Sequence, residues 1–596
     1  MKKVPFYDLR VNGGFWAEKQ KTVRDTTVRA VYDRFEETGR IATMDCKDHG
    51  IKPHFFWGSD VVKWMEGAAY ILEQHDDPDL REKLDALIRA IESGMTGDGN
   101  YNSYFNSPLV DEDRFTDRDR HELYSLGHLM EAAVALAHLG DRRLMRVAEK
   151  NALLVRRLFC EEESAAFVTP GHEEIELALY RMYETTGDEM YLDLAEFFIR
   201  KRGANDKDRP IHAYEKGYGF DYDQAHLPVT EQKTAEGHAV RALYLYCGMA
   251  DLAERLEDDA LRRAVRTLFD DIYEKKMYIT GGVGSNFKGE RFTLPYHLPN
   301  RDAYAETCAA LALALFAARL YRAEPDGKFG DAAERAIFNG MIAGLSLSGD
   351  AFFYTNPLEM DRARAGMPQG YDPKPVRQKV FKCSCCPPNL VRMIPSIADL
   401  VYSYNEEYLF VHQYIATVGT ADGMPVRMET DYPADGKVKI ECKGKKLVMR
   451  RPAWCRDVRC DLPYREEKGY LYFDTDRVEI EFVMAPVFYT ASHNVHEDAG
   501  RVALMRGPIV YCIEGKDQPE DVFRLRVDAD APVAVTEETY GGLPVLTAAG
   551  EILPEQPSLY APYAPAEPRP AVLRFIPYYT FANRGADDMQ VWVLKK

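Results

Sequence analysis

The sequence has no stretch of about 18 uninterrupted apolar residues, so we expect no membrane-spanning helix. No apolar segment follows the two lysines near its start, and we therefore expect no secretory signal. Positive charge is also scarce: 76 Lys and Arg face 95 Asp and Glu, and the formal net charge of −19 argues against nucleic acid and anionic membranes as partners. The cysteines number 11, an odd count that, without an export signal, favours reduced thiols and a cytoplasmic protein.

Helical periodicity dominates the first 410 residues or so. One set of segments combines charge with an apolar stripe, as helices with one wet face do: 80–95, 144–159, 190–200, 261–275 and 329–345. A second set is rich in Ala and Leu, poor in charge, and begins near Asp60, His128, His172, His238, Glu306 and Cys385. Six apolar helices alternating with six amphipathic ones predict an (α/α)6 barrel whose apolar set lines the inside. The amino-terminal ends of these inner helices would then surround one mouth.

After about residue 410 the apolar residues alternate with a period of two, which is typical of half-buried strands. We therefore predict a mainly α fold with a β region: an (α/α)6 barrel catalytic domain followed by one or more C-terminal β-sandwich domains. The expected bounds are 14–410 for the barrel and 411–596 for the β-sandwich region. Residues 1–13 are expected to contribute a strand that packs on the β region.

Cysteine is concentrated at one point, the heptapeptide CSCCPPN at 383–389, which holds three of the 11 cysteines. Cys308, in an upstream Glu-Thr-Cys segment, precedes Cys385 by 77 residues. The adjacent pair Cys385 and Cys386 is poorly placed for an internal disulfide. With Glu306 and Cys308 it offers three thiolates and one carboxylate, a complete tetrahedral ligand set for zinc. The alternatives are a zinc ion that only stabilises the fold and a cluster of buried free thiols.

Other polar residues are expected at the same mouth. Gly-His pairs mark three inner-helix starts, at His128, His172 and His238, and this repetition favours a shared pocket over three unrelated caps or buried polar residues. The glycine-rich segment 280–290, TGGVGSNFKGE, lacks the Gly-Lys-Ser/Thr of a phosphate-binding loop and ends in Glu290. A zinc-held thiolate could act as a nucleophile and Glu290 could protonate a leaving group. Taken alone, however, a loop glutamate is more often simply solvated.

Several motifs together resemble glycoside hydrolase family 127, whose founding activity is β-L-arabinofuranosidase. They are CSCCPPN, the upstream ETC, TGGVGSNFKGE, the three Gly-His starts, FWGSDVVKW and GRVALMRGPIVYC, and they extend over about residues 55–512. The resemblance implies a retaining hydrolase in which Cys385 is the nucleophile and Glu290 the acid/base residue. It also implies Zn²⁺ bound by Glu306, Cys308, Cys385 and Cys386.

The same resemblance extends to the sugar contacts. His128, His172 and His238 match positions that contact the arabinose hydroxyls, and Tyr354 matches a tyrosine close to the nucleophile. His121 lies seven residues before His128, and the choice between the two stays open. We expect an exo-acting enzyme that releases β-L-arabinofuranose from small oligosaccharides or glycoconjugates, and the resemblance also suggests a homodimer. The alternatives are the same scaffold acting on another rare sugar glycoside, a sugar epimerase or isomerase, and a non-catalytic sugar-binding protein with structural zinc.

Overall fold

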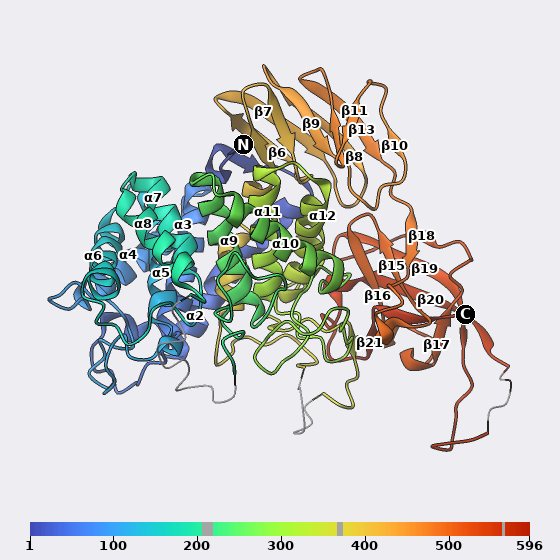
Figure 1. Ribbon diagram of the computed structural model, residues 1–596. Coiled ribbons are helices and arrows are strands. Elements are labelled where there is room, and N and C mark those ends of the chain that lie inside the picture. The colour runs from blue at the N-terminus through green and yellow to red at the C-terminus, as the bar shows by residue number, and fades with distance from the viewer. Residues whose placement is uncertain (205–217, 366–372, 563–564, 566) are drawn as a thin grey trace.

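The computed structural model of the protein describes residues 1–204, 218–365, 373–562, 565 and 567–596. Helices fill the amino-terminal two thirds of the chain, and two strand-rich regions follow them (Figure 1). Among the described residues, no helix is long and apolar enough to cross a membrane.

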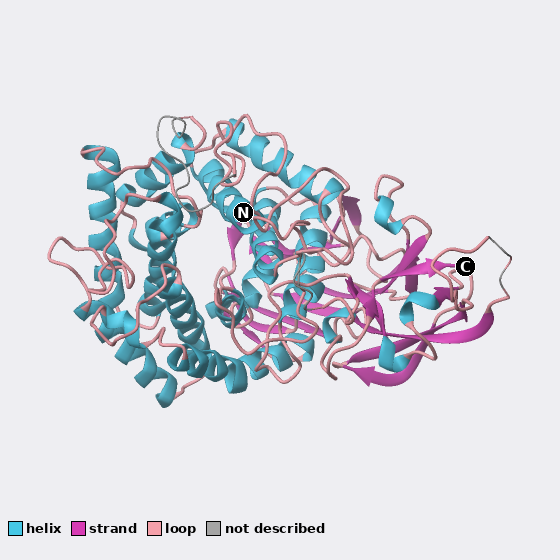
Figure 2. Ribbon diagram, turned by 90° about the horizontal axis from the view of Figure 1, so that it is seen from below, coloured by secondary structure: helices cyan, strands magenta, loops and turns pink. Residues whose placement is uncertain are grey.

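Six helices form an inner ring: α3 (Trp57–Gln74), α5 (Glu122–His138), α7 (Ile175–Thr186), α9 (Ala239–Arg255), α11 (Thr307–Ala323) and α13 (Cys386–Met393). Each packs on its neighbours, and α13 closes the ring by contacting both α11 and α3; Figure 2 looks along it. Small residues permit this packing. A Cβ at Gly67 of α3 would lie 2.5 Å from the carbonyl oxygen of Val391 in α13, so only glycine fits there.

Outer helices surround the ring, and all of them except α1 are amphipathic: α1 (Gly14–Thr22), α2 (Val28–Glu37), α4 (Pro78–Ser93), α6 (Arg143–Arg156), α8 (Glu189–Lys201), α10 (Asp259–Lys275) and α12 (Gly327–Arg335). Four of them begin after an aspartate whose carboxylate accepts a hydrogen bond from a backbone N–H of the first turn: Asp77, Asp188, Asp258 and Asp326. The predicted barrel of inner and outer helices is therefore confirmed.

The first β region consists of two six-stranded sheets. One has the order β1 (Lys2–Lys3), β4 (Tyr402–Tyr404), β5 (Tyr408–Val411), β9 (Lys446–Arg450), β12 (Tyr470–Tyr472), β11 (Arg465–Glu467). The other has the order β10 (Val458–Arg459), β13 (Arg477–Phe482), β8 (Lys437–Cys442), β7 (Met424–Thr430), β6 (Thr417–Ala421), β2 (Leu9–Val11). Strands from the amino terminus thus occupy both sheets. The region begins at Tyr402, so the boundary expected at 410 falls inside β5.

The second β region is a ten-stranded sheet that reaches back to the barrel. Its main path runs β14 (Pro486–Tyr489), β15 (Arg501–Arg506), β22 (Trp592–Lys595), β17 (Leu525–Val527), β19 (Leu543–Ile552), β20 (Arg569–Pro577), β16 (Ile509–Glu514), β21 (Met589–Gln590), β3 (Glu359–Met360), with β18 (Ala534–Tyr540) beside β19. Strand β3 belongs to the segment between α12 and α13. The hydroxyl of Tyr578 also donates to the Pro357 carbonyl at 3.0 Å. The carboxy-terminal sheet therefore holds the loop that carries Tyr354.

Candidate active site

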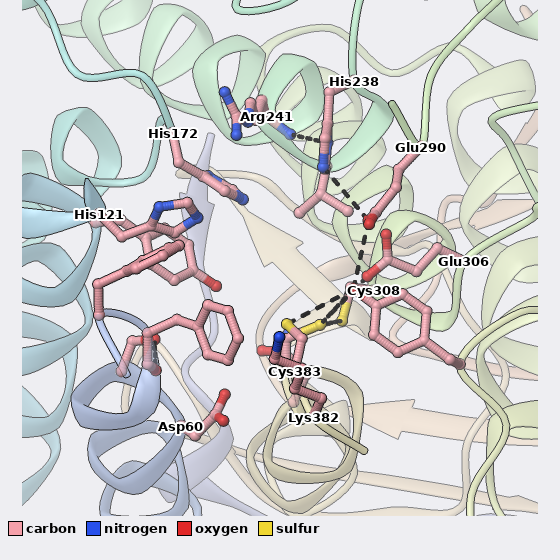
Figure 3. Close-up of a pocket in the computed structure, with 18 of the residues that line it drawn as sticks. Asp60, His121, His172, His238, Arg241, Glu290, Glu306, Cys308, Lys382 and Cys383 are labelled. Carbon is pink, nitrogen blue, oxygen red and sulfur yellow. Dashed lines mark hydrogen bonds and ion pairs between the residues drawn. The ribbon is translucent and has the colours of Figure 1, made fainter. Parts of the chain in front are cut away.

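A cavity of about 270 Å³ opens at the amino-terminal ends of the inner helices. For each inner helix, residues from its start or from the loop before it line the cavity, and Figure 3 shows their side chains converging. All of the predicted site residues except His128 and Cys386 lie on its wall: Cys385, Glu290, His172, His238, Tyr354, Glu306 and Cys308. Among these predicted residues, the ring brings together positions up to 213 residues apart, from His172 to Cys385.

The thiol and carboxylate donors form one compact group. The Cys308 sulfur lies 3.5 Å from that of Cys385 and 3.2 Å from that of Cys386, and the last two are 3.7 Å apart. Oε1 of Glu306 is 3.4 Å from the Cys385 sulfur and 3.6 Å from the Cys386 sulfur. These four donors lie within 4.8 Å of one another.

The donor set fits a tetrahedral metal ion. Metal–sulfur bonds of about 2.3 Å place the sulfurs of a zinc tetrahedron roughly 3.8 Å apart, close to the spacing of these three thiols. Burial raises the pKa of Glu306 well above its usual range, and the negative charges of Cys385 and Glu290 add to that rise. A cation among the donors would relieve this crowding of acidic groups. Glu306, Cys308, Cys385 and Cys386 could therefore bind a metal ion.

Tyr354 bridges the donor cluster and Glu290. Its hydroxyl lies 3.3 Å from Oε2 of Glu290 and 3.3 Å from the Cys385 sulfur, which places the carboxylate oxygen and the sulfur at most about 6.6 Å apart. Glu290 has φ of 52°, a strained backbone conformation for a residue other than glycine. Nε2 of His238 lies 3.5 Å from its carboxylate. Burial pushes the pKa of Glu290 upward, but hydrogen bonds with His238 and Tyr304 outweigh it and hold the pKa below its ordinary value.

Three histidine rings line the cavity wall side by side, from His121 to His238, which adjoins Glu290. The His172 ring is 5.4 Å from that of His121 and 5.5 Å from that of His238. Burial, reinforced by the charge of Arg241, lowers the pKa of His121 to about 3 and that of His172 well below its usual value. Both imidazoles are therefore neutral near pH 7, and each can donate one hydrogen bond and accept another.

His128 does not lie on the cavity wall, whereas His121, seven residues before it, does. Helix α5 begins at Glu122, five residues before the Gly-His pair, and His121 rather than His128 occupies its N-cap position. His128 is fully buried in the second turn, where its Nδ1 lies 3.2 Å from Glu174 and the Tyr124 ring packs against it at 4.5 Å.

Sequence reasoning assigned no role to several residues of the wall. Arg241 donates to the Gly171 carbonyl at 2.6 Å, and its guanidinium lies 4.4 Å from the centre of the Tyr222 ring. Asp60 pairs with Arg40 at 3.2 Å, and Asn389 closes the cavity beneath the thiols. Their positions in the sequence could have indicated them, because Arg241 and Asn389 each lie in the first turn of an inner helix that begins at a predicted site residue.

Comparison with known proteins gives a consistent result. Residues 8–399 match the model of the β-L-arabinofuranosidase GH127 catalytic domain, and residues 486–594 match the glycoside hydrolase family 127 C-terminal domain. The chain is 35% identical to a non-reducing end β-L-arabinofuranosidase of Bifidobacterium longum subsp. longum, over 92% of this chain and 90% of that protein.

Two solved structures are similar along nearly the whole chain. A GH127 β-L-arabinofuranosidase from Geobacillus stearothermophilus T6 superposes with a TM-score of 0.91 at 37% identity, covering 99% of this chain and 100% of the other. A GH127 β-arabinofuranosidase superposes with a TM-score of 0.89 at 31% identity, covering 100% and 98% of the two chains.

Proposed function

The chain belongs to glycoside hydrolase family 127 and is a glycosidase, and we propose that it is an exo-acting, retaining β-L-arabinofuranosidase. The observation that carries this proposal is the shared contact of Cys385 and Glu290 with the Tyr354 hydroxyl, which sets a thiol and a carboxylate on one wall of a small cavity. Retaining glycosidases hold their two reactive groups about 5 to 5.5 Å apart, whereas inverting enzymes leave roughly 6.5 to 9.5 Å for a water molecule. The upper bound of about 6.6 Å favours retention.

In the first step of the proposed reaction, the Cys385 thiolate attacks the anomeric carbon, the glycosidic C–O bond breaks, and protonated Glu290 gives its proton to the leaving oxygen. In the second step, Glu290 takes a proton from water, the water oxygen attacks the same carbon, and the bond to Cys385 breaks. Glu290 hydrogen-bonds with both His238 and Glu306, and because these bonds help to hold its pKa below the ordinary value, Glu290 must take up a proton before the first step. Two inversions at one carbon give net retention.

Exposure distinguishes the three thiols of the cluster. Cys308 and Cys386 are buried, whereas Cys385 is partly exposed to the cavity. Of these three described thiols, only that of Cys385 lies within hydrogen-bond distance of the Tyr354 hydroxyl. Cys383 also lines the cavity but is not one of the four clustered donors. This arrangement supports Cys385 as the nucleophile.

We assign the metal as Zn²⁺, because three thiols and one carboxylate at tetrahedral spacing suit this ion. When bound, zinc would keep the thiols deprotonated near neutral pH. Asn389 donates a hydrogen bond to the Cys308 sulfur at 3.1 Å, and this bond favours the thiolate form as well.

The size of the cavity supports a single sugar residue as the glycone. At about 270 Å³ it is at the small end of ligand cavities, which run from about 300 to 1,000 Å³. We therefore propose small oligosaccharides or glycoconjugates as substrates.

All 11 cysteines are free thiols, which supports a reducing compartment such as the cytoplasm. The homodimer proposal is supported by the family resemblance alone, and sedimentation of the purified protein tests it.

A hydrolysis screen over 4-nitrophenyl furanosides and pyranosides tests the proposal. We expect release from the β-L-arabinofuranoside, with the β-anomer of free arabinose formed first in an NMR time course. Appearance of the α-anomer first would exclude retention, and release only from another glycoside would replace the substrate. Cys385→Ser should abolish turnover while thermal stability and circular dichroism stay native; substantial residual activity would exclude Cys385 as the nucleophile.

A further inference from the structure

Asn389 lies beneath the thiol cluster with both of its amide atoms already engaged. It is on α13, one turn after the adjacent cysteines, and is 1% exposed. Its Nδ2 donates to the Cys308 sulfur at 3.1 Å, and its Oδ1 accepts from Nε of Arg392 at 2.7 Å. Asn389 and Arg392 are three residues apart, so they share one face of the helix.

The orientation of this amide is fixed by Arg392. An arginine can only donate hydrogen bonds, so the amide atom that faces it must be the oxygen. The nitrogen must then face Cys308. One N–H of the Asn389 amide is therefore directed at the Cys308 sulfur.

Arg392 is itself held in place by groups from other inner helices. Its Nη1 lies 3.0 Å from Oε2 of Glu66 on α3, and its Nη2 donates to the Tyr244 hydroxyl on α9 at 3.1 Å. Glu66 in turn lies 3.2 Å from Nη1 of Arg181 on α7. Arg392 and Glu66 are buried, and such a network holds its members in one arrangement because any break leaves a buried charge unpaired.

We propose that Asn389 is a positioning residue for the metal site, which orients the Cys308 sulfur and tunes its strength as a ligand. This inference rests on the proposed metal site and deepens it. An N–H···S hydrogen bond withdraws electron density from the sulfur and fixes the direction of its lone pairs. Groups that hydrogen-bond to metal ligands from behind typically change metal affinity by about 10- to 100-fold. The buried network of Arg392 and Glu66 therefore acts on the metal site through one amide.

The test compares metal binding by the wild type and two variants of the full chain. Asn389→Leu removes the N–H donor while keeping the branched skeleton of the side chain, and Asn389→Asp turns an acceptor toward the sulfur. Competition with a chromogenic chelator measures Zn²⁺ affinity, and the sulfur-to-metal charge-transfer absorption of Co²⁺-loaded protein reports on the sulfur itself. We expect both variants to bind Zn²⁺ about 10- to 100-fold more weakly and to shift the Co²⁺ absorption.

Asn339→Leu is the matched control. Asn339 is also fully buried, and its amide donates to the Arg335 and Pro508 carbonyls and accepts from Val510 N–H, outside the cavity. Its substitution should leave the affinity and absorption of the metal site unchanged. Affinities within threefold of the wild type and an unchanged spectrum in a folded Asn389 variant would overturn the proposal. If the wild type binds neither ion, the metal assignment itself fails, and the inference with it.

Discussion

Replacing Tyr354 by phenylalanine removes one hydroxyl from between the proposed nucleophile and the proposed acid/base group. That oxygen lies 3.3 Å from both Cys385 and Glu290 and carries a single proton, so it donates to one of them at a time. A hydrogen bond to a charged group contributes about 1.5–3 kcal/mol. Because each 1.4 kcal/mol is about a factor of ten in rate, we expect kcat to fall roughly 10- to 150-fold.

The substitution should leave the fold intact. The ring keeps its contacts with Phe381 at 5.6 Å and with Tyr304 at 6.1 Å, and the Tyr354 carbonyl still accepts from the Thr307 N–H at 2.9 Å. Steady-state kinetics on one 4-nitrophenyl furanoside, with thermal unfolding in parallel, provides the measurement. Tyr402→Phe is the control, since that buried hydroxyl pairs with Thr417 in the first β region at 2.9 Å. A loss in kcat below threefold, or a change confined to KM, would refute the bridging role.

Three further outcomes are expected. Glu290→Gln should lower kcat/KM about 100- to 10,000-fold for glycosides with sugar leaving groups but far less for a 2,4-dinitrophenyl glycoside, which needs no acid; equal losses would exclude the acid role. Cys386→Ala should reduce the bound metal measured by elemental analysis to near zero, whereas Cys247→Ala, a buried thiol outside the cavity, should retain it. Burial lowers the pKa of His121 to about 3, below its unfolded value, so the stability from its neutral form is fully present above about pH 6.5 and is lost as pH falls toward 3. The thermal midpoint of His121→Gln should therefore fall less than that of the wild type between pH 7.5 and pH 5, and parallel curves would contradict this.

The donor cluster was predictable because its signal is local and chemical. Three thiols and a carboxylate near two helix starts have few uses, and the structure places all four within 4.8 Å. The inner helices were equally predictable from the sequence, since a helix buried on all sides must be apolar all round. The start of α5 was predicted less well: the residues from Glu122 to Leu126 include strong helix formers, but the recurring Gly-His pair was taken as the start.

Some features depend on contacts between distant segments, and these only the tertiary structure decided. His121 and His128 are both on or beside α5, but their surroundings differ. Glu174 contacts the buried ring of His128, whereas the ring of His121 faces the cavity. The sequence alone therefore determined which chemistry the chain carries, because residue type and spacing define a ligand set. The ring of helices decided which polar groups face the cavity and which hold them from behind, because burial and hydrogen-bond partners exist only once the helices are packed.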